Sequence, residues 1–424
     1  MPEPRRVSSS KRSRPFRARV LEVESPIDIA REIGRTDSDP EGVGIMTQKG
    51  RTLLVRVDHV PLRAAPLLKQ ELLAAGADSA HARGVADLTV RSTSVVILGT
   101  IGQYRRVLAK LRRQPFQLSQ IGDAIDSALS YYTSRAPRKL PTPHHPLTVG
   151  DRVRVMGIVN ITPDSFSDGG RFQDSAQAVE HAATLALEGA DLLDLGGEST
   201  RPGARPTSPT EEWRRVGPVL RAVLERVEVP VSIDTRHPEV ARKALDAGAD
   251  IINDVSGLGS PAMRRLVART GVPAILMHMR GTPATMQDRT QYVDVRQEVF
   301  SELGDRIDRA LAAGVRPEQI LLDPGLGFSK TPAQSLELLR HVGEFRSLGF
   351  PLVVGASRKS FLGWALGGLP LEARFEASLI AAALAAWQGA EIVRVHDVQA
   401  TVRAVRLVDA LRHGGPVRPP AGPS

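Results

Sequence analysis

The chain has 424 residues, 42% hydrophobic and 24% charged, which is the composition of a soluble globular protein with room for two or three domains. It contains no cysteine, which excludes disulfides, thiol nucleophiles, iron–sulfur clusters and cysteine-ligated zinc, so any metal must have oxygen or histidine ligands, as a hard ion such as magnesium prefers. The net charge is +9, but aromatic residues make up only 4% and no nucleic-acid motif is present, so we expect an anionic small-molecule substrate and no nucleic acid.

The sequence predicts no membrane span and no secretory signal. The apolar run Leu379–Trp387 is far too short to cross a bilayer. The basic residues near the N-terminus are not followed by the apolar core of a signal peptide. We therefore expect a cytoplasmic protein without membrane association.

The first third of the chain is predicted to contain a basic arm and a small α/β domain. Residues 1–15 are poor in apolar side chains and are expected to be disordered. Residues 16–134 have their own pattern of strands and helices. The expected strands are Arg51–Val57 and the end of Asp87–Leu98, and the expected helices are Leu62–Ala75, Gly102–Arg113 and Ile121–Tyr132. The sequence assigns no chemistry to this domain.

Residues 135–149 are predicted to be a linker. The segment is rich in proline and polar side chains, which favours an extended connection. His144 and His145 are neighbours in this segment, and a metal site requires ligands that converge from different places. We interpret both histidines as linker residues rather than metal ligands.

Residues 150–412 show a regular alternation of strands and helices, and residues 413–424 are expected to be a disordered tail. Eight apolar runs have the length of buried strands: Val153–Ile161, Asp191–Leu195, Val229–Ile233, Asp250–Asn253, Pro273–Met277, Ile320–Leu322, Pro351–Val354 and Glu391–Val395. Helical segments lie between most of them, and several end at glycines typical of helix C-caps, such as Gly189, Gly248, Gly314 and Gly389. Eight such units predict a (β/α)8 barrel, with a doubly wound sheet as the alternative.

Nearly every predicted strand ends in a polar or ionisable residue. These residues are Asn160, Asp194, Asp234, Asn253, Asp254, His278, Asp323, Ser357, Arg358, Lys359, Arg394 and His396. One aspartate at a strand end is usually a helix N-cap, but the C-terminal strand ends of a barrel meet at one rim, which is where barrel enzymes carry their active sites. Carboxylates and carboxamides on some strands, with cations on the last two, suit a neutral nitrogen heterocycle beside a phosphate group.

Two glycine-containing loops strengthen this interpretation. Met156–Gly170 begins as an apolar strand and turns at Thr162 and Pro163 into an acidic, hydroxyl-rich loop, because proline cannot continue a central strand. Gly196–Gly203 presents Arg201 between glycines, which favours contact with an anion.

The motifs of this region resemble those of dihydropteroate synthases. They are MGIVNITPDSFSDGG, DLGGESTRPGA, SIDT, IIND, LMHMRG, DPGLGF, GASRKSF and RVHDV, and they occur in the family's order between about Arg152 and Leu411. One departure is Ser329, where the family usually has glycine, so this loop is expected to differ in flexibility. Residues 1–148 lie outside the resemblance.

The resemblance implies a transferase of folate synthesis that joins 6-hydroxymethyl-7,8-dihydropterin diphosphate to p-aminobenzoate and releases pyrophosphate. The implied pterin-binding residues are Asp234, Asn253, Met277, Asp323 and Lys359. The implied residues around p-aminobenzoate and the diphosphate are Phe166, Thr200, Arg201, Phe328, Ser360, Arg394 and His396. Lys359, Arg394, His396 and Asp234 are expected to be catalytic, and Asn160 is expected to contact Mg²⁺ or the diphosphate. Family members are commonly dimers, so a homodimer through the barrel is expected.

Two other functions remain open from the residues. A pterin-dependent methyl transferase acting on a corrinoid protein would use a similar barrel, but it has no need of the PDSFSDGG, SRKS and RVH motifs. A non-catalytic protein that keeps the barrel would be expected to have lost its loop and charge residues, and these are present.

Overall fold

The computed structural model describes residues 18–23, 25–134, 136–161, 171–200 and 203–415. The chain divides into two compact units, Met1–Asp126 and Ser127–Ser424. Of the predicted segments, the basic arm, the loop 162–170 and almost all of the C-terminal tail lie outside the described residues.

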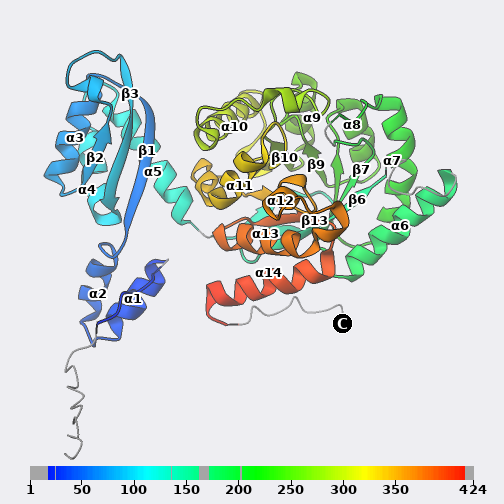
Figure 1. Ribbon diagram of the computed structural model, residues 1–424, viewed down its shortest axis with the longest axis horizontal. Helices are drawn as coiled ribbons and strands as arrows, with labels where there is room; N and C mark the ends of the chain where they lie inside the picture. Colours follow the sequence, from blue (N-terminus) through cyan, green and yellow to red (C-terminus); the bar gives the residue numbers. More distant parts are fainter. Residues whose placement is uncertain (1–17, 24, 135, 162–170, 201–202, 416–424) are drawn as a thin grey trace, which may run out of the picture. The chain divides into compact units, whose positions relative to one another are not determined.

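The N-terminal unit contains a three-stranded antiparallel sheet in the order β1-β3-β2 (Figure 1). Its strands are β1 (Thr52–Pro61), β2 (Asp78–His81) and β3 (Ser92–Thr100), and its helices are α1 (Pro26–Gly34), α2 (Pro40–Thr47), α3 (Ala64–Ala74) and α4 (Ile101–Leu111). The strands and helices expected between residues 51 and 113 are present, while α1, α2 and β2 were not predicted.

The sheet of this unit packs its alternate side chains against helices. Val95 and Ile97 of β3 are fully buried, and the residues between them and beside them are more exposed, as the twofold repeat of a strand requires. Helix α4 begins with a capping box between Thr100 and Gln103. Helix α5 (Leu118–Thr133) follows and crosses the division between the units.

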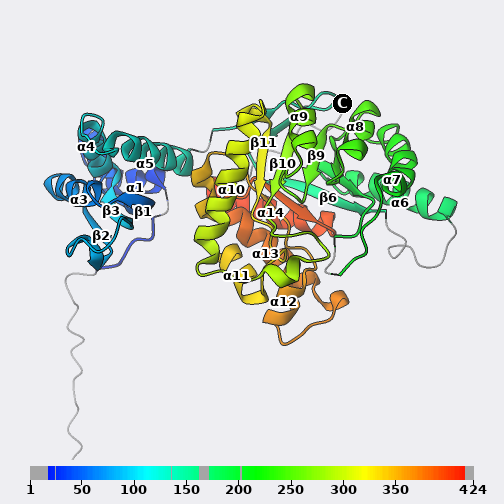
Figure 2. The same cartoon turned by 90° about the horizontal axis from the view of Figure 1, so that it is seen from above.

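The second unit contains the predicted barrel (Figures 1 and 2). Eight parallel strands pair in the order β11-β10-β9-β8-β7-β6-β13-β12. A parallel bridge from Leu322 to Leu352 joins the two ends of this order, so the sheet closes on itself. The doubly wound alternative is therefore wrong. The strands are β6 (Arg154–Asn160), β7 (Leu192–Gly196), β8 (Val231–Asp234), β9 (Ile251–Asp254), β10 (Ala274–Met277), β11 (Ile320–Asp323), β12 (Val353–Val354) and β13 (Ile392–Val395).

Helices surround the strands, as Figure 2 shows. They are α6 (Arg171–Leu187), α7 (Pro209–Leu224), α8 (Pro238–Asp246), α9 (Pro261–Thr270), α10 (Val295–Ala312), α11 (Pro332–Arg340), α12 (Ser360–Ala365), α13 (Phe375–Gln388) and α14 (Val398–His413). The four glycines expected near helix C-termini all have left-handed φ angles. No helix in the described part of the chain combines the length and the apolar character needed to cross a bilayer.

The segment predicted as a linker instead contains a β-hairpin. Strands β4 (Arg138–Leu140) and β5 (Leu147–Val149) pair antiparallel. Leu140, Leu147 and Val149 are buried in one cluster with side chains of the barrel strands, such as Met156 and Ile275. The linker prediction was wrong because each strand has only three residues, too short for a periodic pattern to be read.

The two histidines of this hairpin bind a buried aspartate. Asp250, just before β9, accepts hydrogen bonds from the backbone N–H groups of His144 and His145 at 2.9 and 3.3 Å. Its second oxygen lies 3.1 Å from His145 Nδ1 and 3.2 Å from the N–H of Val231. Asp250 is fully buried, so these contacts replace the water that its carboxylate loses. The histidines thus fasten the hairpin to the barrel.

Candidate active site

The centre of the barrel rim is an arginine between two carboxylates. Arg394, on β13, donates from Nε to Asp194 Oδ2 at 2.6 Å and from Nη2 to Asp234 Oδ2 at 2.9 Å. Asn253, at the end of β9, donates to the same oxygen of Asp194 at 3.0 Å. Residues from four strands therefore meet here, as the barrel topology predicted.

Burial sets the charges of this group. Burial raises the pKa of Asp234, and the Arg394 guanidinium, which binds its Oδ2 at 2.9 Å, opposes this shift and favours the carboxylate. Although burial lowers the pKa of Arg394, the two carboxylates outweigh this effect and raise its pKa, so the guanidinium stays charged. Asp194 is completely buried, and its Oδ1 has no hydrogen-bond partner among the described residues.

Asp323 and Lys359 form a second polar group on the rim. Asp323, at the end of β11, is 6% exposed and accepts the N–H of Gly325 through Oδ1 at 2.7 Å. Burial raises the pKa of Asp323. Lys359 is half-buried, donates to the carbonyl of Leu326 at 2.5 Å and lies 4.6 Å from the centre of the Phe328 ring. Burial lowers the pKa of Lys359 to about 8.

An apolar cluster lies beside these polar groups. Met277, at the end of β10, is 4% exposed and packs with Val255, Met279 and Met286, and Phe328 packs against this cluster. The site thus combines hydrogen-bonding groups with an apolar surface, which is typical of a pocket for a flat heterocycle.

The last two strands are followed by His396 and by one further cation, Arg358. His396 Nδ1 lies 3.0 Å from Ser357 Oγ, and the hydroxyl also accepts the backbone N–H of His396 at 3.2 Å. Arg358 pairs with Asp397 through two hydrogen bonds of 3.1 and 2.6 Å, so its charge is already matched. Ser360 is exposed at the start of α12.

Sequence and structure comparisons agree with this geometry. A family model described as "pterin binding enzyme" matches residues 156–396. A dihydropteroate synthase from Synechocystis sp. is 44% identical over 290 residues, which are 68% of this chain and 99% of the relative. A solved structure of dihydropteroate synthase from Xanthomonas albilineans with 4-aminobenzoic acid is 46% identical with a TM-score of 0.62, covering 65% of this chain and 99% of its own. The chain belongs to the dihydropteroate synthase family of pterin-binding enzymes. Family membership makes it a transferase of folate biosynthesis, as the motifs predicted.

The similarity also reaches the N-terminal unit. A probable bifunctional folylpolyglutamate synthase/dihydropteroate synthase from Halobacterium salinarum is 41% identical over 396 residues, which are 93% of this chain and 47% of the relative. The chain thus spans about half the length of that relative. Since the match covers 93% of this chain, it must include most of residues 1–148. Residues 1–148, which lie outside the motif resemblance, therefore have a counterpart in this relative.

Ser329 stands where dihydropteroate synthases usually have glycine, and its side chain is hydrogen-bonded. Ser329 has a left-handed φ of 48°, a conformation that glycine adopts most readily. Its hydroxyl accepts the N–H of Arg280 at 2.9 Å, donates to the carbonyl of Phe328 at 2.7 Å and lies 3.3 Å from the hydroxyl of Tyr292. These bonds offset the strain, so the expected difference in loop flexibility stays a prediction.

Four predicted site residues belong to the ends of the first two barrel strands and the loops that follow them. Asn160 ends β6, where it is paired with Gly196 of β7. Thr200 is half-buried in the loop after β7. Phe166 and Arg201 lie outside the described residues.

Asn160 is the predicted magnesium ligand, and its carboxamide is an oxygen ligand of the kind that a magnesium ion held with phosphate groups uses. Magnesium in such sites takes one or two protein oxygens, together with water and substrate phosphate oxygens, and Asn160 supplies one carboxamide oxygen at the rim. Within the described residues, one group of three carboxylate or histidine side chains lies close enough to share an ion: Glu198, Glu212 and His237. Arg236 already binds both oxygens of Glu198 at 2.9 Å, and His237 Nδ1 lies 2.6 Å from Glu212, so this group is an internal ion-pair cluster.

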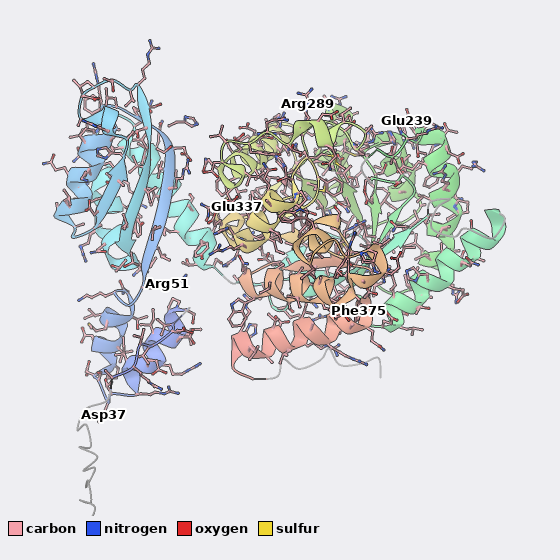
Figure 3. All side chains as sticks on the ribbon, viewed as in Figure 1. Asp37, Arg51, Glu239, Arg289, Glu337 and Phe375 are labelled. Atoms are coloured by element: carbon pink, nitrogen blue, oxygen red, sulfur yellow. The ribbon has the colours of Figure 1, made fainter. Side chains whose placement is uncertain are left out.

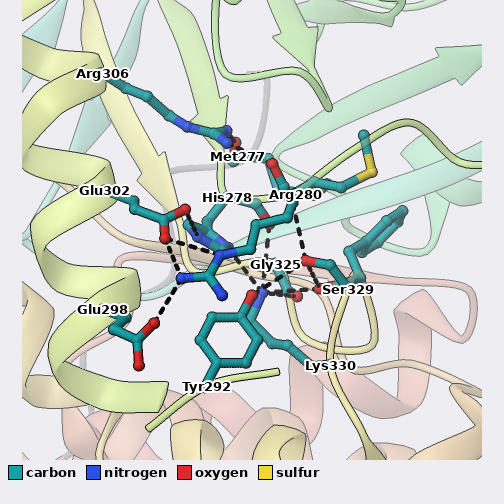
Figure 4. Close-up of polar contacts among 12 residues, drawn as sticks. Met277, His278, Arg280, Tyr292, Glu298, Glu302, Arg306, Gly325, Ser329 and Lys330 are labelled. Atoms are coloured by element: carbon teal, nitrogen blue, oxygen red, sulfur yellow. Dashed lines mark hydrogen bonds and ion pairs between the residues drawn. The ribbon is translucent and has the colours of Figure 1, made fainter. Parts of the chain in front are cut away.

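The structure adds a buried network that sequence reasoning did not assign. We call Lys330, His278, Glu302 and Arg280 the loop anchor (Figure 4). Arg280 binds Glu298 and Glu302 and stacks 3.9 Å from the Tyr292 ring. His278 stood among the polar strand ends, but the available signal for Lys330 was only its place after a glycine-bracketed loop.

Proposed function

We propose that the chain condenses 6-hydroxymethyl-7,8-dihydropterin diphosphate with p-aminobenzoate to give 7,8-dihydropteroate and pyrophosphate. The observation that supports this best is the set of hydrogen-bonding groups around one rim beside an apolar cluster: Asn253 and Asp323 are buried and Asp234 is largely buried. Each carboxylate uses one oxygen for a protein donor, Arg394 or Gly325. The second oxygen of each is suited to accept an N–H of the pterin ring.

The pterin ring would lie between the carboxylates and the apolar side chains. Asp234 and Asp323 would accept its N–H groups, and the carboxamide of Asn253 would bind its edge. Lys359 would donate to a ring acceptor from the side of Phe328, where its ammonium already lies. Met277 would contact the ring face. A site that hydrogen-bonds the ring at several positions strongly rejects analogues that lack the matching donors and acceptors.

The diphosphate would bind beside Arg394 and His396. Breaking the carbon–oxygen bond places negative charge on the leaving pyrophosphate, and fixed cations are most useful where that charge develops. A magnesium ion bound with Asn160 would neutralise part of the same charge. In the structure, Arg394 uses Nε and Nη2 for carboxylates, so its Nη1 edge is the one assigned to the diphosphate.

The incoming p-aminobenzoate would be placed by residues of the segments after β6, β7 and β11 and by the start of α12. Phe328 and Ser360 would shape its pocket, together with Phe166, Thr200 and Arg201. Its aromatic amine is neutral at pH 7, so no strong general base is needed. Because the pterin ring can delocalise positive charge at its methylene carbon, a dissociative path is favoured, and a large secondary deuterium isotope effect at that carbon is expected.

Product formation tests the proposal directly. The full chain is supplied with the pterin diphosphate, p-aminobenzoate and Mg²⁺, and the products are separated by chromatography and identified by mass. The expected product is 7,8-dihydropteroate. A parallel reaction with a methylated tetrahydropterin and a corrinoid acceptor tests the methyl-transfer alternative; methyl transfer there without dihydropteroate in the first reaction would overturn the proposal.

We also propose that the protein forms a homodimer through α13 and α14, which pack side by side on the barrel. Ile380 and Leu384 of α13 are 60% and 49% exposed, and Leu407 and Leu411 of α14 are each 63% exposed. Phe375, labelled in Figure 3, begins α13 and is 39% exposed. Exposed apolar side chains gathered on neighbouring helices favour association. Light scattering after size-exclusion chromatography should give a dimer mass for the wild type and a monomer mass for the double variant I380E/L384E; a monomeric wild type would contradict the proposal.

A further inference from the structure

Lys330 is a buried lysine that turns back onto the loop it follows. It lies between the loop after β11 and the start of α11, and it is 3% exposed. Its ammonium nitrogen lies 2.9 Å from His278 Nδ1, 3.0 Å from the carbonyl of Gly325 and 2.9 Å from the carbonyl of Phe328 (Figure 4). The carbonyl of His278 is a fourth, more distant neighbour at 3.5 Å.

These contacts define one arrangement of protons. The three near neighbours can all act as acceptors, which matches the three N–H groups of a charged ammonium. Burial lowers the pKa of Lys330, but it also lowers the pKa of His278, and beside a neutral imidazole a neutral amine would leave one of these acceptors without a donor. Since His278 Nδ1 accepts from Lys330, the proton of the ring is on Nε2, which donates to Glu302 at 3.0 Å.

The two carbonyls that Lys330 binds belong to residues that shape the rim. The N–H of Gly325 donates to Asp323 at 2.7 Å, so the position of Gly325 sets the orientation of that carboxylate. The side chain of Phe328 packs on the Met277 cluster and faces Lys359. The Lys330 ammonium therefore binds both Gly325, which orients Asp323, and Phe328, whose ring lies beside Lys359.

The loop also has little freedom to find another position. A Cβ added to Gly325 would lie 2.0 Å from the carbonyl oxygen of His278, so the loop backbone rests directly on the end of β10. Lys359 binds the carbonyl of Leu326 in the same loop. Lys359 is half-buried and faces the proposed ligand, whereas Lys330 is buried away from it.

We propose that Lys330 is a positioning residue for pterin recognition: through the carbonyls of Gly325 and Phe328, and braced by His278 and Glu302, it holds the Asp323 carboxylate and the Phe328 ring in their binding positions. This inference rests on the proposed function, because it concerns the same ligand. A purely structural lysine would stabilise the barrel equally but would leave pterin affinity unchanged in the folded protein.

Calorimetric titration of the full chain with 6-hydroxymethylpterin separates these roles. The variant K330M keeps the length of the side chain and removes its charge and donors. We expect its dissociation constant for the pterin to rise roughly 10- to 100-fold, as for other residues that orient a binding group from behind. The control is L220A, which removes buried side-chain atoms from α7, away from the loop; at a temperature where it is folded, its pterin affinity should equal that of the wild type.

Two variants of His278 test the hydrogen bonds from His278 to Lys330 and Glu302 without removing the lysine. In H278Q the amide can accept from Lys330 and donate to Glu302, as the neutral imidazole does, so affinity should be retained. In H278L both bonds are lost, and affinity should fall severalfold. This pair decides the question if K330M does not fold. Wild-type affinity in K330M, or equal affinity in H278Q and H278L, would overturn the inference, whereas a wild type that binds no pterin would overturn the proposed function instead.

Discussion

The rim of the barrel and the loop anchor are both buried and charged, but they use their hydrogen-bonding capacity differently. At the rim, Asp234 and Asp323 each give one oxygen to a protein donor. In the loop anchor, Lys330 has three close acceptors, both ring nitrogens of His278 are bonded, and both oxygens of Glu302 accept. Groups with an unused hydrogen-bond acceptor indicate where a ligand binds. Groups whose donors and acceptors are all used indicate the part of the protein that positions the binding groups. Substitutions at the rim should therefore affect activity more than stability, and those in the loop anchor should affect stability as well.

The largest effect is expected for D323N. The amide oxygen can still accept the N–H of Gly325, so the loop should keep its shape, but the NH₂ group cannot accept a hydrogen bond from a pterin N–H. We expect kcat/KM for the pterin diphosphate to fall roughly 10²- to 10³-fold, because a charged hydrogen bond is lost and a ligand donor is left unpaired. Steady-state kinetics gives this number.

Thermal unfolding of the same variant provides the control. Burial of the Asp323 carboxylate is unfavourable, as its raised pKa indicates, so the neutral amide should unfold at an equal or higher temperature. A D323N variant with wild-type kcat/KM would show that Asp323 does not read the pterin.

The next effect concerns E302Q in the loop anchor. Glutamine offers one acceptor where Glu302 offers two, so either His278 or Arg280 meets an N–H group instead of an oxygen. We expect the free energy of unfolding to fall by about 1.5–3 kcal/mol, the value of a hydrogen bond to a charged group, with a smaller effect on kcat/KM than in D323N. Urea denaturation measures the change.

The matched comparison for this variant is E298Q. Glu298 also binds Arg280, at 2.8 Å, and its side chain is as exposed as that of Glu302, but it does not touch His278. Its other oxygen accepts the backbone N–H groups of Val293 and Asp294, beside the exposed Val293, where water can replace it. E298Q should therefore lose less stability. Equal losses in the two variants would mean that the bond from Glu302 to His278 contributes nothing.

The loop anchor should also make stability depend on pH. Burial, reinforced by the charge of Lys330, lowers the pKa of His278 to about 3. The unfolded chain takes up this proton near pH 6.5, whereas the folded chain does so only near pH 3, so this residue makes the protein less stable as pH falls through that window. The free energy of unfolding falls by at most about 1.4 kcal/mol per pH unit for one titrating group.

Comparing the wild type with H278Q isolates this residue, because the other titrating groups are shared. From pH 7 to pH 5, the stability of H278Q should rise relative to the wild type. A difference that stays constant over this range would show that His278 does not titrate as the structure indicates.

The smallest effects are expected at Ser329. S329A loses the hydroxyl bonds to Arg280 and Phe328 and keeps the left-handed backbone, so it should be less stable by about 1 kcal/mol. S329G loses the same bonds but also the strain, which is of similar size, and should lie near the wild type. If S329G were the less stable of the two in urea denaturation, backbone strain at residue 329 would not matter.

The parts of the molecule that could be predicted are those governed by repetition. The barrel strands alternate regularly with helices, and their C-terminal ends converge, so Asp234, Asn253, Asp323 and Arg394 could be placed on one rim before the structure was known. The hairpin could not, because β4 and β5 are too short for a pattern and are held by Asp250, about a hundred residues away. Lys330 was missed for a related reason: its three acceptors come together only when the loop and β10 are folded against each other.

The measurement that tests the central claim most directly is the release of pyrophosphate from the pterin diphosphate by the full chain with Mg²⁺, with and without p-aminobenzoate. The account predicts pyrophosphate and 7,8-dihydropteroate in equal amounts, at a rate that D323N lowers roughly 10²- to 10³-fold. Tight pterin binding without turnover, or turnover that D323N leaves unchanged, would contradict it.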